Sequence, residues 1–275
     1  FYDIGSQAGN NGSPLQTTTD ESRVIFDKTK PRITQASFLS NNTYGDSLAK
    51  VNDIGTISFV LDEKLRSIST IVDGDSIIMN GADQNFSYNY SFSDLNDNGR
   101  ILLSMLALDS ASNQADTIID RIYFDKTAPQ LSAIFEGSIN EDKVYSKHGD
   151  SLQLSWQKVE LESGLNRAYI GVGSDSGLVD VVNWTMASGD DESSLTSINL
   201  QNNSKYYGSI YLEDNVGNIS DSLWGNGIII DLVPPVVGDV WDGFLDEDID
   251  YTADSTQLFI RWKDFTDNQA IDYYE

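Results

Sequence analysis

Residues 122–129 read IYFDKTAP, an apolar run that ends in Asp125 and is followed four residues later by Pro129. The same arrangement occurs as VIFDKTKP at residues 24–31 and as IIIDLVPP at residues 228–235. The last prolines of these three segments are spaced roughly 100 residues apart, which is the size of one β-sandwich module. Proline fixes φ and cannot donate to a strand ladder, so it suits the seam between two modules. The stretch therefore predicts tandem β-sandwiches joined at Asp-to-Pro segments.

Two further repeats share this spacing. Trp156 follows Pro129 by 27 residues, and Trp262 follows Pro235 by the same 27 residues. Both tryptophans end a run that alternates apolar and polar residues, which is typical of a half-buried strand with an aromatic in the core. In addition, the apolar run and tight turn at 211–218 precede the third seam as those at 107–113 precede the second. These patterns predict the last hairpin of each sandwich.

The repeats divide the chain into four parts. Residues 1–31 are expected to be the C-terminal hairpin of a truncated module, and residues 236–275 the first strands of another. Residues 32–129 and 130–235 are expected to be two whole modules. On this interpretation the chain is a slice of a longer tandem array.

Composition excludes several functional classes. The 275 residues include 17 basic and 43 acidic side chains, a formal net charge of −26, so no basic surface is available to neutralise nucleic-acid phosphates. With no cysteine, the chain has no disulfide, thiolate zinc site or cysteine nucleophile. Short apolar runs rich in Ile, Val, Tyr, Phe and Trp predict an all-β fold, and none approaches the roughly 18–20 residues that cross a bilayer.

Residues 130–235 resemble a fibronectin type III domain. The resemblance rests on Trp156 at the end of a strand, on the Asp214–Asn218 turn, and on Leu200 six residues before Tyr206, the spacing of the tyrosine corner. Residues 236–275 begin the same pattern, with Trp262.

Residues 32–129 are more similar to a bacterial Ig-like repeat, through the strand at 55–61 and the turns at 72–74 and 97–99, and they lack the strand tryptophan. The resemblance implies tandem immunoglobulin-like (fibronectin type III-like) β-sandwiches of a large bacterial surface or secreted protein. It does not imply one ligand.

The fibronectin-like topology would bring acidic residues together at each seam. The first group is Asp27, Asp62, Glu63 and Asp109. The second is Asp125, Glu160, Glu162 and Asp214. The third is Asp231 with Asp264 and Asp267, approached by Glu141 and Asp142. Carboxylates and carbonyls are hard oxygen ligands suited to Ca²⁺, which would stiffen the junctions as the resemblance to adhesin stalks implies. The alternative is that Asp-x-x-Gly-Asn is turn chemistry alone.

Other candidate sites are weaker. Residues 94–99 match the first half of an EF-hand loop, but Met105 occupies the position of the essential Glu, which favours a plain hairpin turn. His148 is the one imidazole in the chain, and no catalytic triad is indicated. We therefore expect the chain not to be an enzyme.

Exposed aromatics provide a second hypothesis. Trp184, Trp224 and Trp241 lie outside the expected core position, and such rings can stack on sugars. Trp224, near the last hairpin of its module, is the first candidate among them, but its position favours a residue that covers a module interface.

The sequence thus favours a non-catalytic extracellular stalk of a bacterial surface-associated or adhesin-like protein, with Ca²⁺ at its junctions. Its partners would be flanking modules of the same chain, and glycans or another cell surface. The alternative is a set of carbohydrate-binding accessory modules of a secreted polysaccharide-degrading enzyme.

Overall fold

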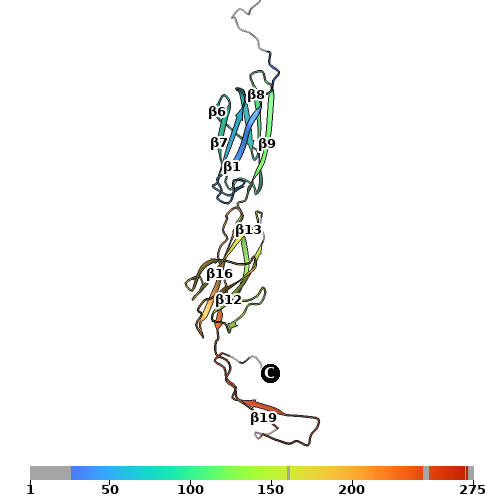
Figure 1. Ribbon diagram of the computed structural model, residues 1–275, viewed down its shortest axis with the longest axis vertical. Coiled ribbons are helices and arrows are strands. Elements are labelled where there is room, and N and C mark those ends of the chain that lie inside the picture. Colours follow the sequence, from blue (N-terminus) through green and yellow to red (C-terminus); the bar gives the residue numbers. More distant parts are fainter. Residues whose placement is uncertain (1–25, 160–161, 244–247, 270, 272–275) are drawn as a thin grey trace, which may run out of the picture. The chain divides into compact units, whose positions relative to one another are not determined.

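The computed structural model describes residues 26–159, 162–243, 248–269 and 271. Across these residues the regular structure is β-strand throughout, without a helix, which confirms the predicted all-β class. The strands form two successive sandwiches and one separate two-stranded sheet (Figure 1). The described residues contain no helix that is long and apolar enough to cross a membrane.

The first sandwich combines a sheet in the order β1-β3-β7-β6 with a sheet in the order β2-β9-β8-β4-β5. The first sheet contains β1 (Ile33–Ser40), β3 (Ile54–Leu61), β6 (Asn80–Ala82) and β7 (Asn85–Ser91). The second contains β2 (Leu48–Ala49), β4 (Leu65–Val72), β5 (Asp75–Ile77), β8 (Gly99–Asp109) and β9 (Gln114–Phe124).

Alternating side chains from both sheets fill the first core. Phe38 and Phe59 face inward from one sheet and Leu103 from the other, each with none of its surface exposed. Apolar burial of this kind contributes roughly 1.5–3 kcal/mol for each large side chain. Strands β4 and β5 are joined through Asp73 and Gly74, whose φ values of 51° and 88° are those that a type I′ hairpin requires.

The second sandwich combines a sheet in the order β10-β12-β15 with a sheet in the order β11-β18-β16-β13-β14, to which β17 adds by pairing with β16. The smaller sheet contains β10 (Gln130–Phe135), β12 (Ser151–Val159) and β15 (Glu192–Thr196). The larger contains β11 (Tyr145–Ser146), β13 (Leu165–Gly173), β14 (Val182–Met186), β16 (Lys205–Asp214), β17 (Leu223–Trp224) and β18 (Ile228–Ile230).

Two signals from the sequence are confirmed in this sandwich. Trp156 at the centre of the core is 1% exposed, and its indole nitrogen donates to the carbonyl of Asp190 at 2.9 Å. The hydroxyl of Tyr206 accepts a hydrogen bond from the backbone amide of Gln201 at 2.9 Å, next to the buried Leu200. This is the geometry of a tyrosine corner, which ties the start of β16 to the preceding turn.

Strands β19 (Asp239–Asp242) and β20 (Ile260–Lys263) pair only with each other among the described residues. Trp262, which the sequence placed at a core position, is 51% exposed. The physical reason is that a two-stranded sheet offers its side chains no second sheet to pack against.

Contacts along the chain separate it into two compact units, which we describe one at a time. The first comprises 26–41, 54–91 and 100–122 of the described residues. The second comprises 42–53, 92–99 and the described residues from 123 onward. The second unit therefore includes the connection between β1 and β3 and the turn before β8.

Candidate functional site

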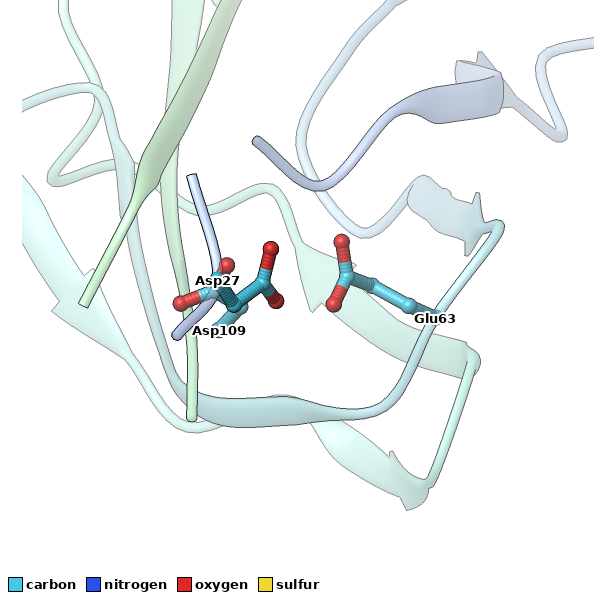
Figure 2. A group of neighbouring side chains, drawn as sticks. All are labelled: Asp27, Glu63 and Asp109. Carbon is cyan, nitrogen blue, oxygen red and sulfur yellow. The ribbon is translucent and has the colours of Figure 1, made fainter. Parts of the chain in front are cut away.

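Three carboxylates from distant parts of the first unit converge on one point. Asp27 lies in the segment before β1, Glu63 in the turn between β3 and β4, and Asp109 at the end of β8. One oxygen from each lies within 4.8 Å of the others, and Figure 2 shows Glu63 reaching toward the neighbouring Asp27 and Asp109. We call these three residues the triacid cluster.

A turn holds two of the three acids in place. The Asp109 carboxylate accepts hydrogen bonds from the backbone and the side-chain amide of Asn113, both at 2.8 Å. The same side-chain amide also donates to the backbone carbonyl of Asp27 at 3.3 Å. Asn113 therefore fixes Asp109 and attaches the segment before β1 to the turn between β8 and β9. We call this pair the Asp109–Asn113 clasp.

The charges of the triacid cluster repel one another. Burial raises the pKa of Glu63 above its ordinary value, and the charges of Asp109, Asp27 and Asp62 raise it further. Burial also acts to raise the pKa of Asp109, but amide donors, led by Asn113, outweigh it and hold this pKa below its ordinary value. Across the described residues no Lys, Arg or His forms an ion pair with the three acids.

Asp62 does not join the triacid cluster. Its carboxylate instead accepts a hydrogen bond from the backbone amide of Arg32 at 2.8 Å. Asp62 therefore fixes the start of β1, while Glu63, the next residue of the turn, belongs to the triacid cluster.

The triacid cluster fits a calcium ion by its chemistry and by its size. Ca²⁺ binds oxygen ligands at about 2.3–2.6 Å, so two of its ligands are at most about 5 Å apart. The 4.8 Å spread of the three oxygens lies inside that limit. Three carboxylates without a basic partner are also the ligand set that a hard divalent cation neutralises best.

A second clasp has the same construction and belongs to the second unit. The Asp214 carboxylate accepts from the backbone and side-chain amides of Asn218, both at 2.8 Å, and the side-chain amide also donates to the carbonyl of Asp125 at 3.1 Å. Asp125 and Asp214 are both buried, and burial raises the pKa of Asp214, with the charge of Asp125 adding to the effect. The structure brings these two predicted residues together.

The other two predicted acids of this group are Glu160 and Glu162. Glu160 lies outside the described residues. Glu162 is exposed, and its backbone carbonyl accepts from the hydroxyl of Tyr123 at 2.9 Å. The backbone amide of Ser163 reaches Asp125 instead, at 3.0 Å.

The Asp-x-x-Gly-Asn turn makes both local and longer-range hydrogen bonds. The turn does satisfy its own backbone, because Val216 and Asn218 donate to Asp214 while Gly217 adopts a φ of 87°. It also reaches beyond itself, because Asn218 attaches the segment that contains Asp125.

The acidic residues of the predicted third group do not all come together: Asp231 and Asp267 lie at one place and Asp142 at another. Asp231 accepts from the side-chain amide of Asn268 at 3.1 Å and lines a cavity together with Asp267. Asp142 lies elsewhere, where its carboxylate accepts from the backbone of Glu136 at 3.0 Å and from the side chain of Asn226 at 2.6 Å.

The loop at residues 94–99, which resembles half of an EF-hand, is hydrogen-bonded to the side chain of Lys126. The ammonium group of Lys126 donates to the carbonyls of Asp94 at 2.9 Å and Asn96 at 2.7 Å. Asn98 in turn accepts from the backbone amide of Lys126 and donates to Thr127. A lysine therefore satisfies carbonyls of this loop.

Trp224, the aromatic that the sequence put first, is 40% exposed. A contiguous aromatic group occurs elsewhere, on the outer face of β13, β14 and β16, where Trp184, Tyr169 and Tyr211 touch one another. The sequence did not point to the two tyrosines, because their contact depends on the register between β13 and β16.

No family model matches the chain, and no curated protein matches it either. Solved structures with similar folds include consecutive domains of titin, with 11% identity, a TM-score of 0.43 and coverage of 76% of this chain and 86% of that one. The FN1–FN3 domains of chicken CNTN1 match at 11% identity and a TM-score of 0.30, covering 78% and 75%.

Two bacterial adhesins also match in fold. A 1.5-MDa ice-binding adhesin matches at 12% identity and a TM-score of 0.40, covering 79% of this chain and 70% of that one. A Ca²⁺-stabilised adhesin of an Antarctic bacterium matches at 12% identity and a TM-score of 0.39, covering 77% and 52%. The paired sheets and the tyrosine corner are the features by which this chain resembles tandem Ig-like and fibronectin type III-like modules.

Proposed function

We propose that this chain is a non-catalytic spacer of an extracellular, adhesin-like surface protein, and that Ca²⁺ bound by Asp27, Glu63 and Asp109 stiffens it. The observation that carries the proposal is the convergence of three carboxylates, for which the described residues provide no ion pair, on the segment that leads into the first sandwich. A cation there would connect that segment to two loops of the sandwich at once.

The course of the strands supports the role of a spacer. β9 begins beside the Asp109–Asn113 clasp and continues for 11 residues. At about 3.3 Å per residue it carries the chain roughly 36 Å away from the triacid cluster. We propose module boundaries at residues 31/32, 129/130 and 235/236, so that each whole module would add a length of this order.

Thermal unfolding of the chain in calcium and in chelator tests the calcium proposal. A ligand that binds only the folded state stabilises it by about 2.7 kcal/mol at one hundred times its dissociation constant. We expect millimolar Ca²⁺ to raise the melting temperature and EDTA to lower it. Mg²⁺ should have less effect, because it keeps its waters and demands a tighter octahedron.

Asp109→Asn and Glu63→Gln should abolish the calcium response. Asp116→Asn is the matched control, because Asp116 is an exposed acid of β9 in the same sandwich, and it should leave the response unchanged. A melting temperature that is the same in calcium and in chelator would refute the calcium site and leave the spacer role to the fold alone.

A second candidate function is carbohydrate binding, which the aromatic group on β13, β14 and β16 favours. It would make the same chain an accessory region that contacts glycans.

A further inference from the structure

The larger sheet of the second sandwich carries three touching rings on its outer face. Tyr169 of β13 and Tyr211 of β16 are register partners, and their rings stack with centroids 4.8 Å apart and planes 16° apart. Trp184 of β14 meets Tyr211 with centroids also 4.8 Å apart but planes at 72°. We call these three residues the aromatic strip.

The aromatic strip is not part of the core. Ala168, Ile170 and Leu212, which alternate with the two tyrosines along the strands, face inward and are buried. All three strip residues retain partial exposure. Three large rings that do not fill the interior, gathered at one place on a solvated face, indicate a surface that can receive a ligand.

Next to the aromatic strip on β13 and β16 lie a positively charged residue, Arg167, and a negatively charged residue, Glu213. Arg167 is the register partner of Glu213, and the neighbouring Tyr169 raises the pKa of the Arg167 guanidinium. Glu213 accepts from the side-chain amide of Asn166 at 3.0 Å, and its carboxylate raises the pKa of the nearby Tyr44. Donors and acceptors alternate here, and the charges of Arg167 and Glu213 oppose each other.

A cavity of about 450 Å³ adjoins these polar groups, within the second unit. Its polar lining includes the amides of Asn166 and Asn215, the exposed carboxylate of Glu162, and the phenols of Tyr44 and Tyr123. This volume falls in the range of about 300–1,000 Å³ that is usual for small-ligand sites.

We infer that the aromatic strip and the adjoining cavity bind a neutral oligosaccharide. A pyranose ring presents C–H groups that pack against the electron-rich faces of Trp and Tyr, and hydroxyls that both donate and accept. Asn166, Asn215 and Glu162, which line the cavity, supply the complementary amide and carboxylate groups. The inference gives the second candidate function its site and ligand class, and it does not depend on calcium.

The charge of the chain argues against other occupants. A net charge of −26 disfavours sulfated or uronic-acid glycans by repulsion. A cationic ligand would meet Arg167 beside Glu213. An apolar partner would cover the polar side chains of the cavity without bonding to them, whereas sugar hydroxyls can donate and accept.

Isothermal titration of the whole chain with cellohexaose, mannohexaose and N-acetylchitohexaose tests this inference, with heparin as the anionic comparison. We expect at least one neutral hexasaccharide to bind and heparin not to bind. Trp184→Ala and Tyr211→Ala should each weaken binding roughly tenfold or more, as expected for a central aromatic contact. Trp224→Ala is the matched control, an exposed tryptophan of the same sandwich, and should keep the wild-type affinity.

Arg167→Gln, at an exposed position, serves as a milder variant if an alanine variant unfolds, and it should weaken binding through the polar end of the strip. Binding should persist in EDTA, which separates this site from the calcium proposal. The inference is overturned if none of the three hexasaccharides binds at millimolar concentration. It is also overturned if heparin binds most tightly, or if the strip variants bind as well as Trp224→Ala.

Discussion

Glu136 is a buried acid that should make the second sandwich less stable as the pH rises. Its side chain has none of its surface exposed, one carboxylate oxygen accepts from the backbone of Gly208 at 2.9 Å, and the other is buried without a hydrogen-bond partner. Burial raises the pKa of Glu136 above its ordinary value of 4.5, and the charge of Asp142 raises it further. Lys143 and His148 are the basic residues that line the same cavity.

The sign of the effect follows from proton linkage. Between pH 4.5 and the raised folded pKa, the folded chain holds a proton on Glu136 that the unfolded chain has released. Stability is therefore fully present below pH 4.5 and falls as the pH rises, at about 1.4 kcal/mol per pH unit for one proton. Above the folded pKa the loss stops growing.

Glu136→Gln keeps the shape of the side chain but removes its ability to ionise, and so removes this proton linkage. At pH 4.5 the variant should lie within about 1.5 kcal/mol of the wild type, the value of one hydrogen bond. At higher pH it should become progressively the more stable of the two. Urea unfolding in chelator from pH 4.5 to 8, followed by tryptophan fluorescence, measures the difference in unfolding free energy.

Glu141→Gln is the matched control, because Glu141 is an exposed acid five residues away in the same segment. Its unfolding free energy should follow that of the wild type at every pH. Parallel pH profiles for the wild type and Glu136→Gln would show that Glu136 is ionised in the folded state and would refute this account of its burial.

Two other substitutions test how the second sandwich is held together. Tyr206→Phe removes the hydroxyl that accepts from Gln201, and it should cost about 0.5–1.5 kcal/mol in urea unfolding; no loss would mean that this hydrogen bond has no net value. Asn218→Ala removes the donor shared by Asp214 and Asp125, so it should cost about 1–3 kcal/mol. Without that donor the pKa of Asp214 should rise further, so the loss should be larger at pH 7 than at pH 4, and an equal loss at both would contradict the clasp.

Local chemistry explains what could be predicted from the sequence. Trp156 and Tyr206 were found because a core aromatic and a tyrosine corner depend on spacing within one or two strands. Asp27, Glu63 and Asp109 were predicted together because the expected topology brings their three segments to one end of a sandwich. The proposed limits of the four modules stay a prediction.

Features that depend on the direction of a single side chain could not be predicted. Asp62 was grouped with Glu63, but its carboxylate turns to the amide of Arg32. Glu136 reads as one of 43 acids in the sequence, and its burial is evident only from the packing of Gly208 and Gly225 around its carboxylate.

Lys126, which contacts the half EF-hand from another segment, gives that loop a property that the triacid cluster lacks. The positive charge that holds the carbonyls of Asp94 and Asn96 is covalently part of the chain, so dialysis cannot remove it. The loop should keep its conformation in distilled water and in seawater alike, whereas any order that the triacid cluster owes to a divalent ion would follow the hardness of the medium. One chain would then contain one loop held by its own lysine and one cluster whose order depends on the divalent ions in the medium.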